Sequence, residues 1–323
     1  MDFTPTSTLI DATELAAQIL AARCSADRLR EVDRIPGRFD AELWAALGEA
    51  GLLGLAVPEE YDGAGLGMVE LAGVIEQAGR HVAAVPLAQH LTAAIAIAEH
   101  GDDEVKRTWL PKAASGEVLF TVADGAPVVQ GPRADAVVDL REGVVLVTEA
   151  QWTPTVLTAG EQAGLLEGGS RTELAADSTR VRECLVTLQA ALQLGVVEGA
   201  LTLTADYART REQFGRPIGT FQAVAQRLAD GYIDVLGLRL TVQQAAWRLS
   251  EGLPAATEVA SAAFWAAEAG HKLAHTAVHI HGGVGIDLDG ETHRFFTAAK
   301  QGEFLLGGAT AAARAIGAEL AAG

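Results

Sequence analysis

The sequence has 323 residues, of which 49% are hydrophobic, so it can bury a sizeable core and form more than one structural unit. Acidic residues outnumber basic ones by 42 to 24, and the resulting net charge of -18 argues against nucleic acid and anionic membrane surfaces as partners. We expect no secretory leader at the first residues, no stretch long and apolar enough to span a bilayer, and, with only Cys24 and Cys184, no disulfide framework. These features indicate a soluble, cytoplasmic protein.

Residues 1–115 are predicted to form a helical domain. One helix is expected to begin after Asp40, whose side chain can cap it, and to end at Gly51. Pro58 and the glycine-rich stretch after it interrupt the helical pattern, which then resumes.

Residues 116–177 have a different character and predict a small β-domain. The segments EVLFTVA, ADAVVDL and GVVLVTEA are short, rich in β-branched residues and separated by Gly, Pro and Asp. This composition is typical of strands and turns.

Residues 178–323 predict a bundle of four amphipathic helices. The first two helices each carry an apolar stripe, one on Leu185, Leu188, Leu192, Val196, Leu203 and Tyr207, the other on Val224, Leu228, Tyr232, Val235, Val242 and Leu249. The third helix is expected at about Thr257–Ile280 and the fourth at about Phe295–Ala321. The whole chain is therefore predicted to be mainly α, with a small β-domain between two helical ones.

The connector between the first two bundle helices, REQFGRPIGTFQ, contains more than a turn requires. Arg211 places a cation at a helix end, where it suits the helix dipole, and Gly215 and Pro217 favour a turn. Phe214 could simply fill the gap between the helices. From these residues alone, a structural role and a functional role both stay open.

The longer stretch DYARTREQFGRPIGTFQAVAQRLAD resembles the helix-loop-helix signature of the flavin-dependent acyl-CoA dehydrogenases. HIHGGVGIDLDGETHRFF is similar to the family's Gln-x-x-Gly-Gly-x-Gly segment, and ELWAALGEAGLLGLAVPEEYDGAGLG and WLPKAASGEVLFTVAD resemble its N-terminal domain and the entry into its β-domain. The resemblance covers nearly the whole chain in the family's order, and it implies the acyl-CoA dehydrogenase fold.

The resemblance also implies FAD as the cofactor and assigns residues to it. In the family, the Arg and Phe of the connector contact the pyrophosphate and adenine end of FAD across a dimer interface, which here points to Arg211 and Phe214, with Gln213 beside them. A guanidinium suits phosphate because it can donate two parallel hydrogen bonds. The second motif adds Gly282 and Gly283, where backbone can approach a ligand, and His279, which replaces the family's Gln.

The family's catalytic base is missing. Counting forward from the second motif places Leu306-Gly307-Gly308 where most members carry the Glu of Glu-Gly-Thr, and the other position known in the family falls on Leu185. Two acids lie near these positions, Glu183 and Glu303, and each is a weak candidate for a relocated base.

The β-segment also departs from the family pattern. Asp124 can stand for the Glu of the Thr-Glu-Pro-x-x-Gly-Ser-Asp pattern that cradles the isoalloxazine ring, but Ala123 replaces the Thr and Gly-Ser-Asp is absent. The segment is also too short for the family's full barrel.

One row of histidines has the spacing of possible metal ligands. His271, His275 and His279 follow one another at i, i+4 and i+8, a spacing at which two imidazoles can share a zinc ion. Three ligands in such a straight row cannot converge on one ion, and His279 already has a place in the flavin motif. We therefore expect no metal.

Three hypotheses follow. The chain resembles the short, base-deficient subunit of actinobacterial-type heterotetrameric acyl-CoA dehydrogenases, some of which act on CoA thioesters of steroid side chains. This implies an acyl-CoA substrate and a second, catalytic dehydrogenase subunit as partner. The alternatives are a homo-oligomeric enzyme that uses Glu183 or Glu303, and a non-enzymatic flavin-binding or scaffolding relative.

Overall fold

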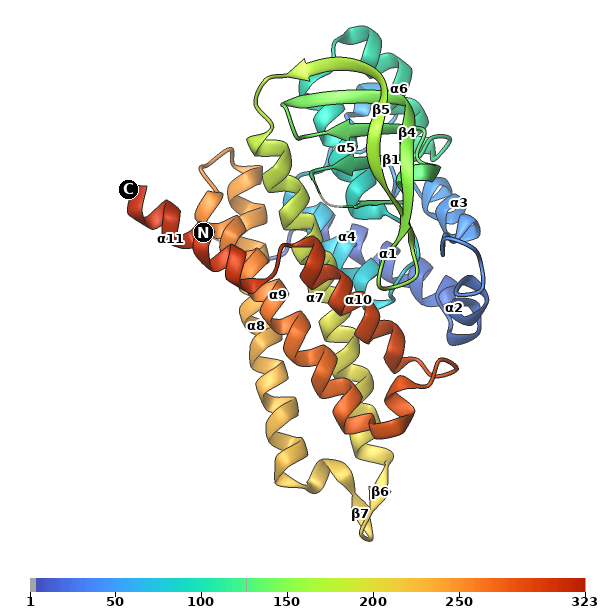
Figure 1. Ribbon diagram of the computed structural model, residues 1–323, viewed down its shortest axis with the longest axis vertical. Helices are drawn as coiled ribbons and strands as arrows, with labels where there is room; N and C mark the ends of the chain where they lie inside the picture. Colours follow the sequence, from blue (N-terminus) through green and yellow to red (C-terminus); the bar gives the residue numbers. More distant parts are fainter. Residues whose placement is uncertain (1–3, 126, 323) are drawn as a thin grey trace.

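A computed structural model of the chain describes residues 4–125 and 127–322. Residues 1–3 and 323, at the ends of the first and third predicted domains, and Ala126 of the middle one lie outside the described residues. Figure 1 shows the helices of the N-terminal part and the sheet packed at one end, with the long bundle helices running away from them.

The N-terminal part consists of six helices and one short 3-10 turn. They are α1 (Ser7–Arg23), α2 (Ala26–Val32), α3 (Ala41–Glu49), η1 (Glu59–Tyr61), α4 (Met68–Arg80), α5 (Leu87–His100) and α6 (Asp103–Ser115). The predicted boundaries of α3 are confirmed, because Asp40 accepts a hydrogen bond from the Leu43 N–H and Gly51 follows the helix with a φ of 75°.

The middle part is a five-stranded sheet in the order β1-β3-β4-β5-β2. Its strands are β1 (Phe120–Ala123), β2 (Val128–Val129), β3 (Ala136–Asp139), β4 (Val144–Val156) and β5 (Gln162–Ala175), with the 3-10 turn η2 (Gly131–Arg133) between β2 and β3. Among the described strands of this sheet, only β1 and β3 pair in parallel. The sheet curls until its two edges meet, since the Thr121 hydroxyl in β1 donates to the Val129 carbonyl in β2 at 2.8 Å.

Strands β4 and β5 are longer than the sequence patterns predicted. They have 13 and 14 residues and form a hairpin whose turn reaches the helix labelled α10 (Figure 1). Residues 162–175 carry no clear alternation of apolar and polar residues, so β5 was not foreseen.

The C-terminal part contains five helices and the connector. They are α7 (Thr179–Thr210), α8 (Gln222–Ser250), α9 (Ala256–His281), α10 (Thr292–Leu305) and α11 (Ala309–Ala322), with η3 (Ile218–Thr220) after the connector and η4 (Gly282–Ile286) after α9. The connector folds as a small hairpin, β6 (Glu212–Gln213) and β7 (Arg216–Pro217), which projects from the far end of the bundle (Figure 1).

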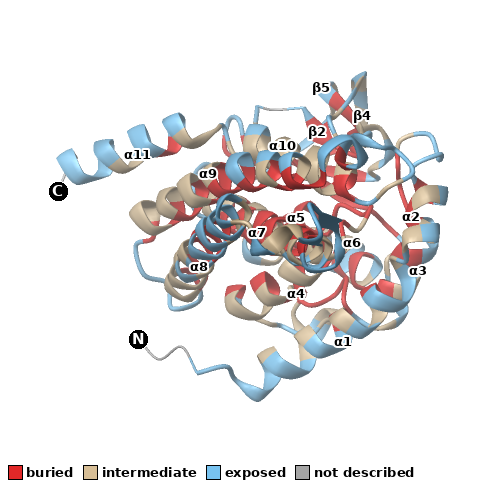
Figure 2. Ribbon diagram, turned by 90° about the horizontal axis from the view of Figure 1, so that it is seen from below, coloured by how far each residue is buried: buried red, intermediate tan, exposed pale blue. Residues whose placement is uncertain are grey.

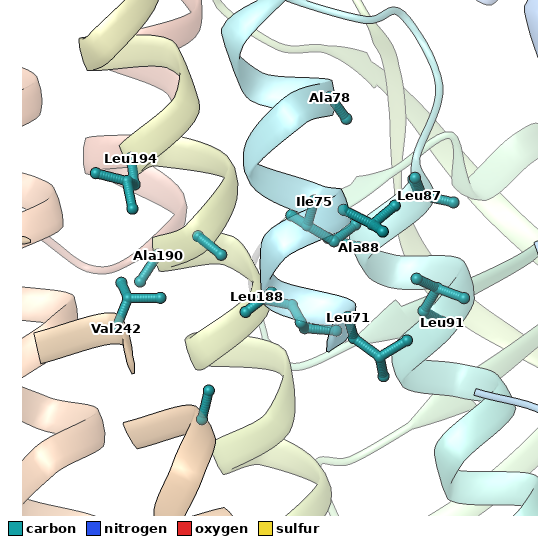
Figure 3. Close-up of a cluster of buried hydrophobic side chains, with 14 of the residues drawn as sticks. Leu71, Ile75, Ala78, Leu87, Ala88, Leu91, Leu188, Ala190, Leu194 and Val242 are labelled. Carbon is teal, nitrogen blue, oxygen red and sulfur yellow. The ribbon is translucent and has the colours of Figure 1, made fainter. Parts of the chain in front are cut away.

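The main core joins the N-terminal part to the bundle. Figure 3 shows side chains of α4, α5, α7 and α8 packed together, among them Leu71, Ile75, Leu91, Leu188, Leu194 and Val242. Helices α4 and α7 touch backbone to backbone, because a Cβ on Gly195 would lie 1.9 Å from the Glu76 carbonyl oxygen and one on Gly79 would lie 2.0 Å from that of Leu192. The two helices leave no space between them at this crossing.

Three of the predictions were wrong in detail. The fourth helix is two helices, because Gly307 and Gly308 adopt φ values of 77° and 79° that end α10 and redirect the chain. The prediction that no stretch is long and apolar enough to span a bilayer was also wrong, because α7 has a mean hydropathy of 1.5 over 18 residues, although 72% of that window is buried in this fold.

The third difference concerns the stripe predicted on α8. Val235, Val242 and Leu249 are buried as expected, but Tyr232 is exposed. Figure 2 shows the first turns of α8 and most of α11 exposed. The stripe is apolar along its whole length, but this chain covers only part of it.

Candidate active site and flavin-binding end

The two positions that we predicted for the family's base, Leu306 and Leu185, hold apolar side chains. Leu306, between α10 and α11, is half-buried and packs against the main core, and the two glycines after it form the break between the helices. Leu185 in α7 is buried among side chains of α5, α6 and the sheet. Both positions are apolar packing sites in this chain.

The two substitute acids, Glu183 and Glu303, have contacts of their own. Burial raises the pKa of Glu183, against the lowering effect of Arg180, and nearby Glu319 of α11 adds to the rise. Glu303 in α10 forms an ion pair with Lys300 and lies 3.3 Å from Nδ1 of His271. Neither acid lines the cavity described next.

A cavity of about 60 Å³ lies where the N-terminal helices, the β4–β5 turn and the bundle meet. Its polar walls come from Arg38, Gln89, Glu161, Gln189, Gln193 and Gln301. Pockets for drug-sized ligands occupy several hundred cubic ångströms, so this one has room for a few water molecules at most.

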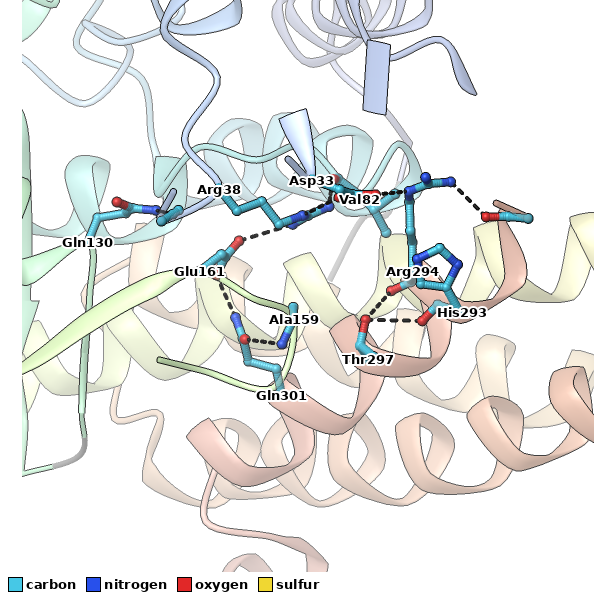
Figure 4. A network of polar contacts seen from close by, with 12 residues as sticks. Asp33, Arg38, Val82, Gln130, Ala159, Glu161, His293, Arg294, Thr297 and Gln301 are labelled. Atoms are coloured by element: carbon cyan, nitrogen blue, oxygen red, sulfur yellow. Dashed lines mark hydrogen bonds and ion pairs between the residues drawn. The ribbon is translucent and has the colours of Figure 1, made fainter. Parts of the chain in front are cut away.

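The β4–β5 turn closes this cavity through a chain of polar contacts (Figure 4). The Ala159 N–H donates to Gln301 Oε1 at 3.0 Å, and Gln301 Nε2 donates to Glu161 Oε2 at 2.6 Å. Glu161 also lies 3.5 Å from the guanidinium of Arg38, which is buried. The turn is thereby fixed to α10 on one side and to the N-terminal helices on the other.

The same chain of contacts continues into the N-terminal part. Arg38 donates to Asp33 at 2.9 Å, and Asp33 accepts a second hydrogen bond, at 2.6 Å, from Arg294 of α10. Both arginines hold the pKa of Asp33 below its usual value, despite the opposing effect of burial. Glu161 is the one carboxylate that lines the cavity among the described residues, and it is committed to this network.

Sequence reasoning missed Arg38, Glu161 and Gln301. They lie more than a hundred residues apart, and none belongs to a recognisable motif. No periodicity or spacing could have brought them together, because only the docking of the β4–β5 turn does so.

Asp124, the predicted substitute for a family Glu, is also engaged. It follows β1 and accepts hydrogen bonds at 2.9 and 3.0 Å from Nε of Arg182 in α7. Arg182 also donates to the Leu140 carbonyl at 2.8 Å. The carboxylate therefore joins the sheet to the bundle.

The predicted flavin residues of the connector lie at the opposite, free end of the molecule. Phe214 is 92% exposed with a φ of 54°, so it does not fill the gap between α7 and α8. Arg211 is exposed at the C-cap of α7, and its guanidinium makes no hydrogen bond or ion pair within the described chain. Gln213 is exposed and donates only to the neighbouring Glu212 carbonyl, at 2.8 Å.

The structure brings the second flavin motif to the same end. His281 at the end of α9 stacks on Tyr207 of α7, with ring centroids 4.3 Å apart, and Tyr207 accepts the Arg211 backbone N–H at 2.8 Å. His279 is exposed one turn before Gly282. Two segments separated by about seventy residues thus meet at one end of the bundle.

The backbone at Gly282 and Gly283 is open to solvent. Gly282 has a φ of 65° and a ψ of -141°, a conformation that other residues rarely adopt, and a Cβ at either glycine would meet nothing within 4 Å. An uncommitted guanidinium, an exposed aromatic ring and accessible backbone form a donor set that fits the phosphates and base of a dinucleotide. They face away from this chain's own core.

The histidine row has neighbours that oppose a metal ion. The rings of His271 and His275 lie 4.7 Å apart, but the ammonium of Lys300 lies 3.2 Å from Nδ1 of His271. Across the described residues, no group of three or more His, Cys, Asp or Glu is arranged to hold a metal.

The chain has the fold of the FAD-dependent dehydrogenases. It combines a helical domain, a curled sheet and a helix bundle, and it places the connector hairpin beside the Gly282-Gly283 turn. The chain belongs to the acyl-CoA dehydrogenase family. Residues 10–117 match the N-terminal domain of that family and residues 187–321 match its C-terminal domain. The predicted family, its fold and FAD as the family's cofactor are confirmed.

Similar proteins cover the whole chain. Acyl-CoA dehydrogenase FadE27 of Mycobacterium tuberculosis is 45% identical over 99% of both chains. A chain of the ChsE4–ChsE5 complex from Mycobacterium tuberculosis has 45% identity and a TM-score of 0.93, and covers 99% of each chain. A chain from a variant of the Tcur3481–Tcur3483 steroid ACAD has 37% identity and a TM-score of 0.92, and covers 98% of this chain and 99% of its own.

Proposed function

We propose that this chain is the base-deficient subunit of a heteromeric, FAD-dependent acyl-CoA dehydrogenase, and that it completes a flavin site in a second, catalytic subunit. The observation that carries this proposal is a division within the molecule. The cavity between its three parts is closed to about 60 Å³, whereas the flavin-motif residues are exposed at the far end of the bundle.

When bound, FAD would supply the acceptor for the β-hydride of the acyl thioester, and a carboxylate would take the α-proton. Arg211 would hold the pyrophosphate through charge-assisted hydrogen bonds, and Phe214 would present its ring to the adenine. His279 and the backbone at Gly282 and Gly283 would hold the adjoining part of the dinucleotide. The proton is taken by the partner's carboxylate, because Leu306 and Leu185 offer no basic atom.

The homo-oligomeric alternative is less well supported. Glu183 and Glu303 do not line the central cavity, and Glu303 is held by Lys300. The relatives with 45% and 37% identity come from structures named for two components, ChsE4–ChsE5 and Tcur3481–Tcur3483. We extend to this chain both the second subunit and, from the steroid ACAD, a steroid side-chain CoA thioester as the substrate.

The test is the flavin content of the complex with a co-expressed dehydrogenase subunit that retains the Glu. Arg211→Ala should weaken FAD binding about ten- to hundredfold, since losing one charged hydrogen bond costs roughly 1.5–3 kcal/mol. The FAD affinity of Arg211→Lys should lie between that of wild type and that of Arg211→Ala, because lysine keeps the charge but cannot donate two parallel hydrogen bonds.

Arg209→Ala is the matched control. Arg209 is also exposed at the end of α7, but it is paired with Asp206. Its removal should leave flavin content unchanged. Full flavin retention by Arg211→Ala would show that the connector is only structural.

A further inference from the structure

Three glutamine side chains on the walls of the central cavity have hydrogen-bonding groups that the protein does not use. The side-chain amide of Gln89 in α5, a residue only 5% exposed, makes no hydrogen bond with any residue that the structure describes. The amide of Gln189 in α7 is half-buried and is also unbonded among these residues. Gln193 of α7, 2% exposed, donates through Nε2 to the Ala299 carbonyl at 2.9 Å, but its Oε1 accepts no hydrogen bond within the described chain.

The free amide atoms are accessible from the cavity. All three glutamines line it. The described polar atoms that have neither a hydrogen bond nor any access for water belong to other side chains, such as Gln130, His293 and Arg294. A buried amide that bonds to nothing costs free energy, so the amides of Gln89 and Gln193 require a partner inside the cavity.

The walls are held in a fixed shape and do not close on one another. Val82, on the wall, has a φ of 43°, which is rare for a β-branched residue, and Arg38 has a φ of 47°. Nη2 of Arg38 donates to the Val82 carbonyl at 3.3 Å and links the two. Gln193 is enclosed by two helices, since a Cβ on Gly270 would lie 1.9 Å from its Nε2 and one on Gly302 would lie 2.2 Å from its Oε1.

The charged groups beside the cavity favour an uncharged occupant (Figure 4). Arg38 is paired with Asp33 and with Glu161, and Asp33 is also paired with Arg294. Two cations and two anions balance, so an ion in the cavity would have no counter-charge and its desolvation would be costly. The occupant must therefore be neutral, and it must both donate and accept hydrogen bonds, as an amide does.

The volume of the cavity selects among neutral molecules. About 60 Å³ is far below the size of an ordinary ligand pocket, but it has room for roughly two to four water molecules. Cavities with apolar walls stay dry, whereas cavities that offer each water two or more polar partners hold ordered water.

We propose that the central cavity is a hydration site, in which a small cluster of ordered water molecules bonds to the amides of Gln89, Gln189 and Gln193. The cluster connects α5 with α7 beneath the β4–β5 turn, and it satisfies amides that the protein leaves without partners. The proposal does not depend on the proposed function, because it concerns only residues of this chain.

The first test is a crystal structure of the purified chain at a resolution that shows ordered water. We expect water peaks in the cavity within hydrogen-bond distance of the glutamine amides. Crystals pressurised with xenon should show no xenon there, because xenon enters dry apolar cavities. A cavity without water peaks, a xenon atom bound in it, or a larger molecule in place of water would overturn the proposal.

Gln89→Leu tests the contribution of one amide. Leucine has no polar atom, so the variant should lose the water that bonds to Gln89. Gln130→Leu is the matched control, because Gln130 is 1% exposed and does not line the cavity, and its Nε2 donates to the Gly37 carbonyl at 2.8 Å. The control should keep every cavity water, and an unchanged set of waters in Gln89→Leu would contradict the role of Gln89.

A second measurement uses the unaltered protein in solution and does not depend on the folding of a variant. The side-chain amide protons of Gln89 should show nuclear Overhauser contacts to water in an NMR spectrum, whereas those of Gln130 should show none. No contact at Gln89, or equal contacts at both residues, would overturn the proposal.

Discussion

His90 is the most deeply buried ionisable side chain at the junction between the N-terminal helices and the sheet. It lies in α5, with Nε2 3.2 Å from the Ala113 carbonyl of α6 and Nδ1 accepting the Phe120 N–H of β1 at 3.2 Å. The edge of its ring meets Trp44, and its face stacks on Phe120. Donation to one carbonyl and acceptance from one amide require the neutral tautomer with the proton on Nε2.

This arrangement predicts a loss of stability in mild acid. Burial lowers the pKa of His90 to about 4, against 6.5 for a free imidazole. The unfolded chain takes up the proton below pH 6.5 and the folded chain does not, so the free energy of unfolding falls between pH 6.5 and 4. The loss at pH 5 should be about 2 kcal/mol.

The measurement is urea unfolding at pH 7.5 and pH 5. His90→Gln can keep both hydrogen bonds without titrating, so its drop in stability between the two pH values should be about 2 kcal/mol smaller. His271→Gln, at an exposed histidine, should show the same drop as wild type. An equal drop in all three proteins would contradict the role assigned to His90.

At the scale of elements, the contact between α4 and α7 depends on glycine. Gly195→Ala would place a methyl group 1.9 Å from the Glu76 carbonyl oxygen, and backbone cannot yield as a flexible side chain can. The helices must separate, and overpacking of this kind costs roughly 1–3 kcal/mol. We expect a lower urea midpoint for Gly195→Ala.

The chain offers an opposite control in Gly317→Ala. Gly317 lies within α11, and a Cβ there meets nothing within 4 Å. The substitution should therefore be neutral or stabilise the helix by up to about 1 kcal/mol. A wild-type midpoint for Gly195→Ala would show that the helices can move apart freely at this crossing.

The helices also show how much of the fold the sequence could predict. Asp40 and Gly51 marked the ends of α3, and the stripes on α7 and α8 predicted long helices, because caps and periodicity are local properties. The split between α10 and α11 was missed because the helix-forming residues on both sides of Gly307-Gly308 read as one continuous helix. Periodicity also placed Tyr232 on the apolar stripe of α8, but this side chain is 59% exposed.

The site residues also fall into those that the sequence could predict and those that it could not. Arg211, Phe214 and the Gly282-Gly283 turn could be named from motifs, and their placement at one end of the bundle follows from the Tyr207–His281 contact. The closure of the central cavity could not be predicted. It depends on the Arg38, Glu161 and Gln301 contacts, which exist only after three distant segments have docked.

At the scale of the whole molecule, the small cavity and the apolar residues at the two predicted base positions lead to one prediction about activity. The purified chain alone should show no acyl-CoA dehydrogenase turnover above background. Its cavity of about 60 Å³ is much smaller than an ordinary ligand pocket, and neither Leu306 nor Leu185 can accept a proton. Activity should appear when a dehydrogenase subunit that retains the Glu is co-expressed, and a steroid side-chain CoA thioester should be a better substrate than a short straight-chain acyl-CoA. The measurement is reduction of an artificial electron acceptor by each preparation, at matched protein concentration and with added FAD.

Turnover by the chain alone would contradict the assignment and support the homo-oligomeric alternative. In that case Glu183→Gln and Glu303→Gln would identify the base, since only the variant that removes it should abolish proton abstraction while leaving substrate binding intact.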